Sequence, residues 1–536
     1  MHKSFKIAMI FSIIIGSIAF AGCSSNKDKN EKDKEGRFKL SLRNLYFNEW
    51  SGGDSYTAYI EDKFNVSITP SNYSWASWDE QVYSPANGNS LTDVFHFSLD
   101  SYNFENSYKY WAKGGVIKAL PDDMSKYPNL KKLIDSATNI ESLKLDGHIY
   151  CVPIIKDISQ SNIEYSPFTY VYRRDWAKEL NVYQENDVYT WDQFLDLLDV
   201  FYEQKCKDNS GFAALADVEW GYPSLTNFYK DYPHIFALDE NGRVVNNYAT
   251  EKYIQGLDLA RSYSCGSKLY YGLSQYTAND GDINEKYVAN RVGVFYENLS
   301  LANYTTLRTN LMKTNKTFTA EQLDDATAIM KVKGPDGKYV LEGTENWFSA
   351  TFFNADMSDE KMDAVLSIME WTLGEEGTMM ATYGMEGHDY NIVNGKVVLT
   401  EDGWEKDKDG KYVAKYNGAK YLRYMSTLSY DTNENDPLVD QHALSILNDW
   451  YSEMDTALAN NQLRILKEDN RIDWAMTPIK LKNAGKMLED ANSSVMKYCY
   501  GANTGRNYSK EDYLASFNTT TWNTCLAELN ELLGNE

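Results

Sequence analysis

An alternation of strand and helix patterns between Phe38 and Phe97 constrains the fold of this chain most strongly. Apolar residues alternate in Phe38–Leu42, as they do in a strand, and Val66–Pro70 and Asp93–Phe97 are predicted as the next two strands. Between the first two, Tyr56–Phe64 has apolar residues three and four positions apart, which predicts a helix. Strand–helix–strand order is typical of α/β folds with a parallel sheet. The sequence therefore predicts an α/β fold.

Polar loops follow two of these predicted strands. In a parallel sheet, ligands bind beyond the carboxyl ends of the strands. A carboxylate in such a loop is suited to bind ligand hydroxyl groups, because its oxygens accept several hydrogen bonds. Ordinary loop and cap hydrogen bonds are the alternative role. The candidates for ligand binding in these loops are Asn48, Glu49, Trp50 and Asp100.

Aromatic residues are unusually frequent: the chain has 13 Trp, 41 Tyr and 21 Phe, which together make 14% of it. Sugars have apolar C–H faces flanked by hydroxyl groups, and such faces stack on aromatic rings. Most of the rings are expected to fill the core, so only those in or next to loops are candidates for a binding surface. These candidates are Trp75, Trp78, Trp220, Tyr222 and Trp347, with ordinary packing as the alternative for each.

Length and charge limit the architecture and the partners. A chain of 536 residues is too long for one hydrophobic core, so two or more lobes are expected. Its 43% hydrophobic and 24% charged content is that of an ordinary globular protein. The formal net charge of −24 repels phosphate backbones, so nucleic acid is not an expected partner.

Cysteine and histidine spacing predicts no metal centre and no cofactor. The five cysteines after Cys23 are far apart and form no CxxC pair, and the six histidines show no HExxH spacing. We expect the five cysteines to be buried free thiols, although a single disulfide stays open.

The N-terminus has the pattern of an export signal. Lys3 and Lys6 precede an apolar run, Ile7–Phe20, that is too short for a comfortable membrane span. Small residues then lead to Cys23, and the whole segment resembles a bacterial lipoprotein signal, with Phe20 where that signal usually has Leu. The resemblance implies removal of residues 1–22, lipidation of Cys23 and a place on the outer face of the cell membrane, as in Gram-positive surface lipoproteins. Residues 23–37 are predicted to be a flexible, charged tether.

Five short elements further along the chain carry a second resemblance: Leu145–Pro153, Tyr172–Trp176, Thr190–Phe194, Gly334–Gly337 and Tyr383–Tyr390. In this order they are similar to elements of the extracellular solute-binding proteins of family 1, which serve carbohydrate ABC importers. The likeness extends from residue 1 to about 395 and is looser beyond that.

The resemblance implies a two-lobed, periplasmic-binding-protein-like fold of type II, with a hinge between the lobes and the ligand in the cleft. One lobe would hold 38–155 plus 330–400, and the other 158–328 plus 401–536. It also implies a monomer that closes on an oligosaccharide and delivers it to the membrane subunits of an ABC permease. Trp347 and His388 are candidate cleft residues on this reading, although a structural role is the alternative for His388.

The sequence departs from the family at 205–211, where relatives often carry an acidic loop able to hold calcium. Too few carboxylates are present there for six to eight oxygen ligands, so no calcium is expected. Two other functions stay open. A surface glycoside hydrolase would need two carboxylates across one bond, such as Glu49 with Asp100 or Glu297. A receptor for peptides or amino acids would need a strong charge clamp. We expect a binding protein and not an enzyme.

Overall fold

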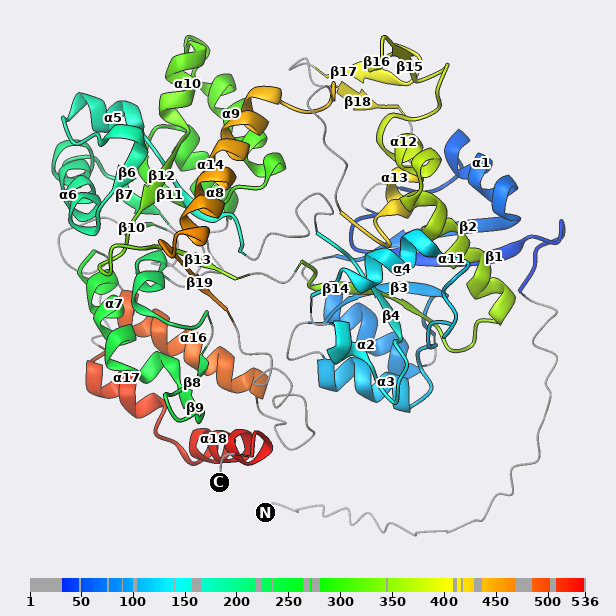
Figure 1. The fold of residues 1–536 in the computed structure, drawn as a ribbon, viewed down its shortest axis with the longest axis horizontal. Helices are drawn as coiled ribbons and strands as arrows, with labels where there is room; N and C mark the ends of the chain where they lie inside the picture. Colours follow the sequence, from blue (N-terminus) through cyan, green and yellow to red (C-terminus); the bar gives the residue numbers. More distant parts are fainter. Residues whose placement is uncertain are drawn as a thin grey trace, which may run out of the picture.

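The chain forms two α/β bodies, each built around its own β-sheet (Figure 1). We name the body that contains the N-terminal strands the first lobe and the other body the second lobe. The computed structural model describes residues 31–47, 50–74, 77–88, 90–99, 104–138, 140–156, 165–216, 223–233, 235–263, 270–271, 280–343, 346–407, 412–415, 418–428, 436–467, 484–501 and 508–534.

The sheet of the first lobe has five strands in the order β2-β1-β3-β14-β4. β1 pairs in parallel with β2 and β3, whereas β14 pairs antiparallel with β3 and β4. β14 therefore joins this sheet only after the chain has built most of the second lobe. The strands are β1 (Phe38–Asn44), β2 (Val66–Asn72), β3 (Val94–Ser98), β4 (Cys151–Pro153) and β14 (Ser349–Phe353).

Aromatic rings fill much of the core of the first lobe. Tyr83 and Trp111, from α2 and α3, pack against Phe97 of β3 with ring centroids 5.4 and 5.5 Å away. Phe95 stacks on Phe352 of the neighbouring strand β14 at 5.3 Å. The helices of this lobe are α1 (Ser55–Phe64), α2 (Trp78–Gly88), α3 (Tyr110–Lys113), α4 (Pro128–Asp135), α11 (Asp359–Leu373), α12 (Glu375–Tyr383) and α13 (Gly418–Arg423).

The sheet of the second lobe has six strands in the order β10-β7-β11-β5-β12-β6. β5 runs antiparallel to its neighbours β11 and β12, and the other pairs are parallel. The strands are β5 (Phe168–Tyr172), β6 (Val188–Tyr189), β7 (Ala213–Ala216), β10 (Tyr270–Tyr271), β11 (Val292–Asn298) and β12 (Ala328–Val332).

Helices cover both faces of the second sheet. Alternate residues of a strand point to opposite faces, and β5 shows this directly. Tyr170 and Tyr172 join a core with α6 and α7, whereas Val171 joins a core with α9 and α14. The helices are α5 (Arg174–Glu179), α6 (Trp191–Phe201), α7 (Glu251–Arg261), α8 (Asp280–Val288), α9 (Leu301–Thr314), α10 (Ala320–Ala326), α14 (Gln441–Ala459), α16 (Ala484–Tyr500), α17 (Lys510–Ser516) and α18 (Thr520–Leu532).

Four two-stranded pairs complete the described strands. β13 (Tyr339–Glu342) and β19 (Leu463–Leu466) run parallel in the second lobe, where β8 (Phe236–Leu238) and β9 (Val244–Asn246) form a hairpin. Two further hairpins lie above the first lobe in Figure 1: β15 (Tyr390–Val393) with β16 (Lys396–Leu399), and β17 (Trp404–Lys406) with β18 (Tyr412–Ala414).

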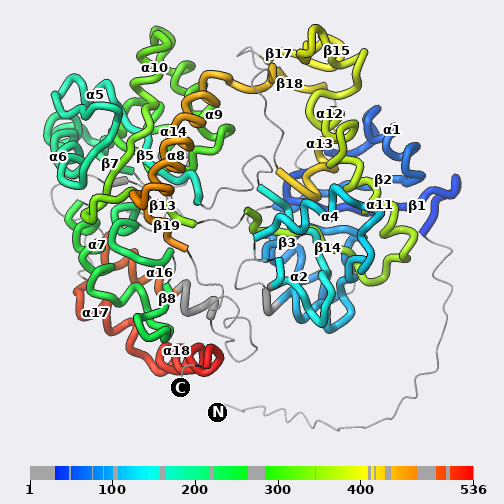
Figure 2. The backbone as a smooth tube through the Cα atoms, viewed as in Figure 1, coloured from blue at the N-terminus to red at the C-terminus, as the bar shows by residue number. Residues whose placement is uncertain are grey.

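The chain passes between the lobes three times, as the colour order in Figure 2 shows. The first pass lies between β4 and β5, the second between β13 and β14, and the third between α13 and α14. Each lobe is therefore assembled from segments far apart in the sequence.

The predicted α/β fold is confirmed, and its first three predicted strands are β1, β2 and β3. The stretch 329–332 lies inside the second lobe and takes no part in a crossing between lobes. It belongs to β12, an interior strand between β5 and β6, because its apolar residues alternate between the two cores of the second lobe. The crossing to the first lobe begins only after β13.

Two stretches pack in a different lobe from the one the expected boundaries gave them. Residues 330–342, expected with the first lobe, form parts of β12 and β13 in the second lobe. Residues 418–425, expected with the second lobe, lie in the core of the first lobe through Leu422 and Met425. Burial of apolar side chains decides both placements.

Residues 31–37 also differ from expectation, because they lie against the first lobe. The carboxylate of Glu31 accepts the N–H of Ser358, the N-cap residue of α11, at 3.2 Å. The backbone N–H of Lys39 donates to the carbonyl of Glu31 at 2.8 Å. These bonds leave 23–30 for the expected tether, a segment outside the described residues.

Cysteines and helix lengths complete the description. Cys151, Cys206, Cys499 and Cys525 are buried free thiols, which confirms that prediction for these four. Cys265 lies outside the described residues. Within the described ranges, no helix combines the length and the apolar character that crossing a bilayer requires.

Candidate ligand-binding site

The three passes between the lobes lie side by side and form a hinge region. Ile155 in the first pass forms a parallel bridge with Thr427 in the third. The hydroxyl of Thr427 also donates to the carbonyl of Ile155 at 2.9 Å. Backbone hydrogen bonds join the passes, among them Lys156 N to Asn346 O (2.8 Å), Leu428 N to Ile155 O (2.9 Å), Ile155 N to Ser426 O (3.0 Å) and Ser166 N to Glu342 O (2.7 Å).

Parallel strands of both sheets end at the edge that faces this hinge. In the first lobe, Ser98 at the end of β3 pairs with Ser349, the residue at which β14 begins after the second pass. In the second lobe, Asn298 at the end of β11 pairs with Phe168, at which β5 begins after the first pass. Loops at the carboxyl ends of strands are the usual place for ligands in open α/β sheets. The two hinge-facing edges are therefore the candidate ligand-binding region.

An aromatic surface lies at the hinge-facing edge of the first lobe. It consists of Tyr46, which follows β1, and of Tyr421 and Tyr424, which lie just before Thr427, and the buried ring of Trp50 lies against it. Trp50 stacks on Tyr421 with ring centroids 5.6 Å apart and planes 12° apart. Tyr46 and Tyr421 lie about the same distance, 6.0 and 6.1 Å, from Tyr424. The three tyrosines are half-buried, so parts of their rings face solvent.

Uncharged groups pack against the buried side of this first aromatic surface. His96 of β3 lies between Tyr46 and Trp78, with ring centroids 5.5 and 4.8 Å away. Its Nδ1 accepts the N–H of Leu45 at 3.3 Å, and burial lowers the pKa of His96 to about 3. Burial likewise raises the pKa of Tyr46 to about 12. Both groups are uncharged at neutral pH, which suits a surface for uncharged ligands.

A second, smaller aromatic surface lies at the hinge-facing edge of the second lobe. Phe168 and Tyr296 stack with ring centroids 5.8 Å apart and planes 28° apart, and both are half-buried. The side-chain amide of Asn227 donates to the hydroxyl of Tyr296 at 2.9 Å. This bond fixes the direction of the ring. Each lobe thus presents aromatic rings next to the hinge.

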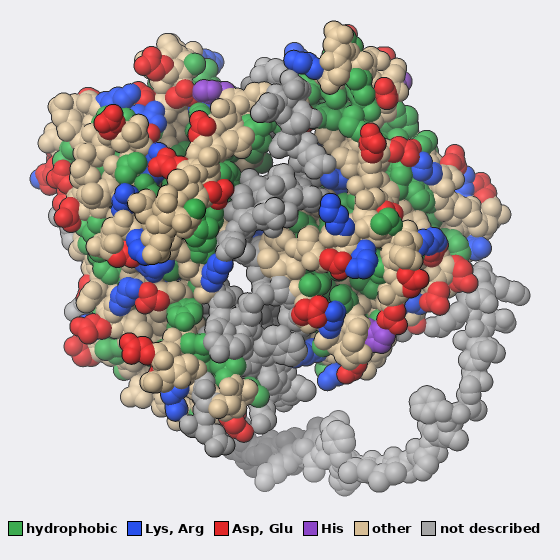
Figure 3. Space-filling model, viewed as in Figure 1, with side chains coloured by type: hydrophobic (Ala, Val, Ile, Leu, Met, Phe, Trp, Pro, Cys, Tyr) green, Lys and Arg blue, Asp and Glu red, His purple; other side chains and the backbone are tan. Residues whose placement is uncertain are grey.

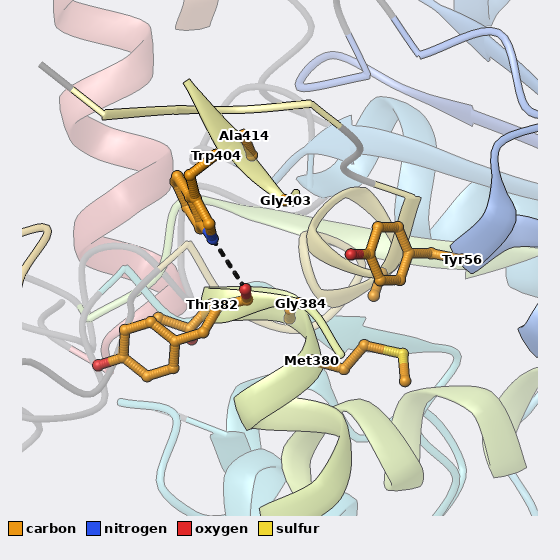
Figure 4. Close-up of a pocket in the computed structure, with 10 residues that line it drawn as sticks. Tyr56, Met380, Thr382, Gly384, Gly403, Trp404 and Ala414 are labelled. Atoms are coloured by element: carbon orange, nitrogen blue, oxygen red, sulfur yellow. Dashed lines mark hydrogen bonds between the residues drawn. The ribbon is translucent and has the colours of Figure 1, made fainter. Parts of the chain in front are cut away.

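The small space in Figure 4, where α1, α12 and β17 meet, is no ligand site. Its volume of about 10 Å³ is enough for one water molecule at most. The indole of Trp404 points into it and donates to the carbonyl of Tyr383 at 3.0 Å. This contact ties the β17–β18 hairpin to the end of α12.

Asp389, beside this space, fastens the hairpins to the first lobe. Its buried carboxylate accepts the hydroxyl of Tyr56 from α1 and the N–H of Met385. Glycine is required at Gly384, whose φ is +96°, and at Gly403, because a Cβ there would lie 2.5 and 2.2 Å from Asp389 side-chain atoms.

His388 binds the same carboxylate from outside. Its Nδ1 lies 2.7 Å from Oδ1 of Asp389, and this bond raises the pKa of His388. The His388 side chain is 60% exposed, and Asp389 is 1% exposed. The observed contacts of His388 are those of a structural residue, and its predicted ligand contact stays a prediction.

Three predicted tryptophans lie inside the first lobe. Trp50, Trp78 and Trp347 are 7%, 8% and 4% exposed, so none presents an open ring face to solvent. The indole of Trp347 donates to the carbonyl of Thr138 at 2.8 Å, which anchors the second pass to the lobe. Direct ligand contact by these three rings stays a prediction. The other predicted residues lie outside the described ranges: Asn48, Glu49, Trp75, Asp100, Trp220, Tyr222 and the lipidation site Cys23.

Sequence reasoning missed the tyrosines of both aromatic surfaces. Tyr46 lies two residues after the end of β1, so the rule that ligands bind beyond strand ends could have identified it. Tyr421 and Tyr424 could not have been identified in this way, because they lie nearly 380 residues further along the chain and come beside β1 only after the second pass has returned the chain to the first lobe. Phe168 and Tyr296 sit within strands, where a ring is ordinarily assigned to the core.

Charge gives no sign of another kind of site. In the described part of the chain, no three His, Cys, Asp or Glu side chains gather in a way that could hold a metal ion. On the face shown in Figure 3, Lys and Arg side chains are interspersed with Asp and Glu over both lobes.

Solved structures show where else this architecture occurs. An extracellular solute-binding protein from Bifidobacterium longum subsp. infantis superposes with a TM-score of 0.64 and 13% identity, over 94% of this chain and 99% of that one. An alginate-binding protein solved without calcium ion gives 0.60 and 13% over 92% and 98%. An N-glycan transport solute binding protein from Streptococcus pneumoniae gives 0.57 and 14% over 93% and 99%. No protein-family model and no curated protein matches the sequence. At these identities the comparisons concern the fold, and the chain has the two-lobed α/β fold of solute-binding proteins.

Proposed function

We propose that this chain is the carbohydrate-binding protein of an ABC importer, a solute-binding protein of family 1 that captures an oligosaccharide between its lobes. The observation that carries the proposal is the pair of aromatic surfaces, one on each lobe, at the hinge-facing edges of the sheets. Ring faces stack on the C–H faces of sugars, and tyrosine hydroxyls and Asn227 supply hydrogen bonds.

Closure of the lobes would bring the two surfaces together on the ligand. Ligand sites commonly lie between lobes, and hinge closure is a common response of two-lobed binding proteins. Fold neighbours named for alginate binding and for N-glycan transport support a carbohydrate as the ligand class. Lipidation at Cys23, a place on the outer face of the membrane, and delivery to permease subunits belong to the same proposal.

Calorimetry with protein lacking residues 1–23 tests this function. The panel contains kestose, a mannose-rich N-glycan, an alginate oligomer and a tripeptide, and each recovered ligand is then analysed by chromatography. We expect at least one oligosaccharide to bind and to be recovered intact. Cleaved sugar would establish the glycoside hydrolase instead, and binding of the tripeptide alone would establish the peptide receptor.

Variants locate the site within that experiment. We expect Tyr424→Ala and Tyr296→Ala each to weaken sugar binding by at least about 1 kcal/mol, since truncating an aromatic anchor at an interface has that effect. Tyr296→Phe keeps the ring and should retain most of the affinity. Tyr110→Ala is the control, because Tyr110 is 70% exposed and belongs to α3. Unchanged affinity in both alanine variants would remove the aromatic surfaces from the site.

A further inference from the structure

A pocket of about 590 Å³ opens between α8 and α9 of the second lobe. This volume is within the range of about 300–1,000 Å³ that small-molecule sites occupy. One end of the pocket is formed by Glu297 and Leu299, at the carboxyl end of β11. Glu297 directly follows Tyr296, so the pocket begins at the same strand end as the second aromatic surface.

The α9 wall of the pocket is a row of uncharged polar side chains. Asn303, Thr306, Asn310 and Thr314 are spaced three and four residues apart, which places them on one face of the helix. Within the part of the chain that the structure describes, the side chains of Thr306 and Asn310 have no hydrogen-bonding partner. Their polar atoms are therefore available to a ligand.

The rest of the pocket lining consists of an apolar floor and a wall, facing α9, that holds both polar and charged side chains. Leu299 and Leu307 are buried and form an apolar floor, and α8 contributes Asn284 to the facing wall. The charged lining residues are two acids, Glu285 and Glu297, and one base, Lys313. Acids outnumber bases, so the lining favours an uncharged ligand over one that carries a carboxylate on each unit.

We propose that this α8–α9 pocket is a second subsite for a neutral oligosaccharide, which holds sugar units that extend beyond the aromatic surfaces. Amides and hydroxyls both donate and accept, as sugar hydroxyls do, and the leucine floor meets C–H faces. The inference rests on the proposed function and adds to it the ligand's charge class and its extended length.

The test is a chain-length series measured on protein lacking residues 1–23. Fructo-, malto-, xylo- and alginate oligosaccharides, each from the disaccharide to the hexasaccharide, are titrated into wild type and into the double variant Thr306→Val/Asn310→Ala. In wild type we expect affinity to rise with length in a neutral series. In the double variant we expect the longer members to lose at least about fivefold in affinity, since two hydrogen bonds are removed, while the shortest binding member is unchanged.

A control and two distinct failures complete the design. Thr309→Val lies on the same helix outside the pocket lining and should keep the wild-type length dependence. Circular dichroism of all variants establishes that they fold. The second subsite alone is overturned if the double variant keeps the wild-type length dependence. It is also overturned if the alginate series binds more tightly than every neutral series. Failure of every oligosaccharide to bind wild type overturns the proposed function as well.

Discussion

The pKa values of two histidines in the first lobe are shifted in opposite directions by their surroundings. His96 is fully buried beneath Tyr46, and burial disfavours its charged form, so its pKa falls to about 3. His388 is exposed beside the buried carboxylate of Asp389, and the hydrogen bond to that carboxylate raises its pKa. The two residues must therefore contribute to stability with opposite dependence on pH.

The His96 pKa gives a prediction for acid conditions. The unfolded chain takes up a proton at His96 near pH 6.5, whereas the folded chain does so only near pH 3. Relative to a His96→Phe variant, we therefore expect wild type to lose stability progressively as the pH falls from about 6.5 towards about 3. Unfolding midpoints of both proteins across this range measure the difference.

His388→Asn serves as the control of opposite sign. The raised pKa of His388 means that its stabilisation is fully present below the unfolded pKa of 6.5 and is lost as the pH rises through the folded pKa. The advantage of wild type over this variant should accordingly grow on acidification. A pH-independent difference for His96→Phe would contradict the buried neutral state of His96.

Among the elements, α6 begins with a cap that its local sequence contains. Thr190 and Gln193 form a capping box: the Gln193 side chain accepts the N–H of Thr190 at 3.0 Å, and the Thr190 hydroxyl accepts the N–H of Gln193 at 3.4 Å. Such a cap depends on residues three positions apart, so the sequence contains it entirely.

We expect Thr190→Ala to lower the free energy of unfolding by about 1 kcal/mol, the usual loss for removing an N-cap hydroxyl. Urea unfolding followed by tryptophan fluorescence measures it, because Trp191 is buried at the start of α6. Thr190→Ser keeps the accepting oxygen and should be close to wild type. An equal loss in both variants would show that the hydroxyl is not what stabilises the helix.

The segment 328–332 shows where local pattern is not enough. Its sequence fits any extended segment, and the boundaries implied by the resemblance divided it between the lobes. In the structure it lies between β5 and β6, with Met330 in one core and Ile329 in the other. Which strands flank it depends on residues more than 130 positions away, such as Val188, its partner through Lys331.

At the scale of the whole molecule, the three passes make relative motion of the lobes the expected response to ligand. Each lobe has its own core, and the backbone bonds around Ile155 and Thr427 join them at one side. A ligand that contacts both aromatic surfaces would favour the closed arrangement by its added contacts.

We expect the radius of gyration in small-angle X-ray scattering to fall when the oligosaccharide that binds in calorimetry is added to saturation. The unfolding temperature should rise in parallel, because a ligand at about a hundredfold excess over its Kd stabilises the folded state by roughly 2.7 kcal/mol. An unchanged radius at saturation would contradict closure while leaving sugar binding intact.

The local parts of this protein follow from its sequence alone: the α/β class, the first three strands and the buried thiols that the structure describes. All of these depend on residue spacing within a few turns or on the apolar character of a side chain. Three features are set by tertiary contacts: the assignment of 330–342 and 418–425 to lobes, the folding back of Glu31–Arg37, and the gathering of Tyr46 with Tyr421 and Tyr424. These features depend on contacts between distant segments, which no periodicity within one segment encodes.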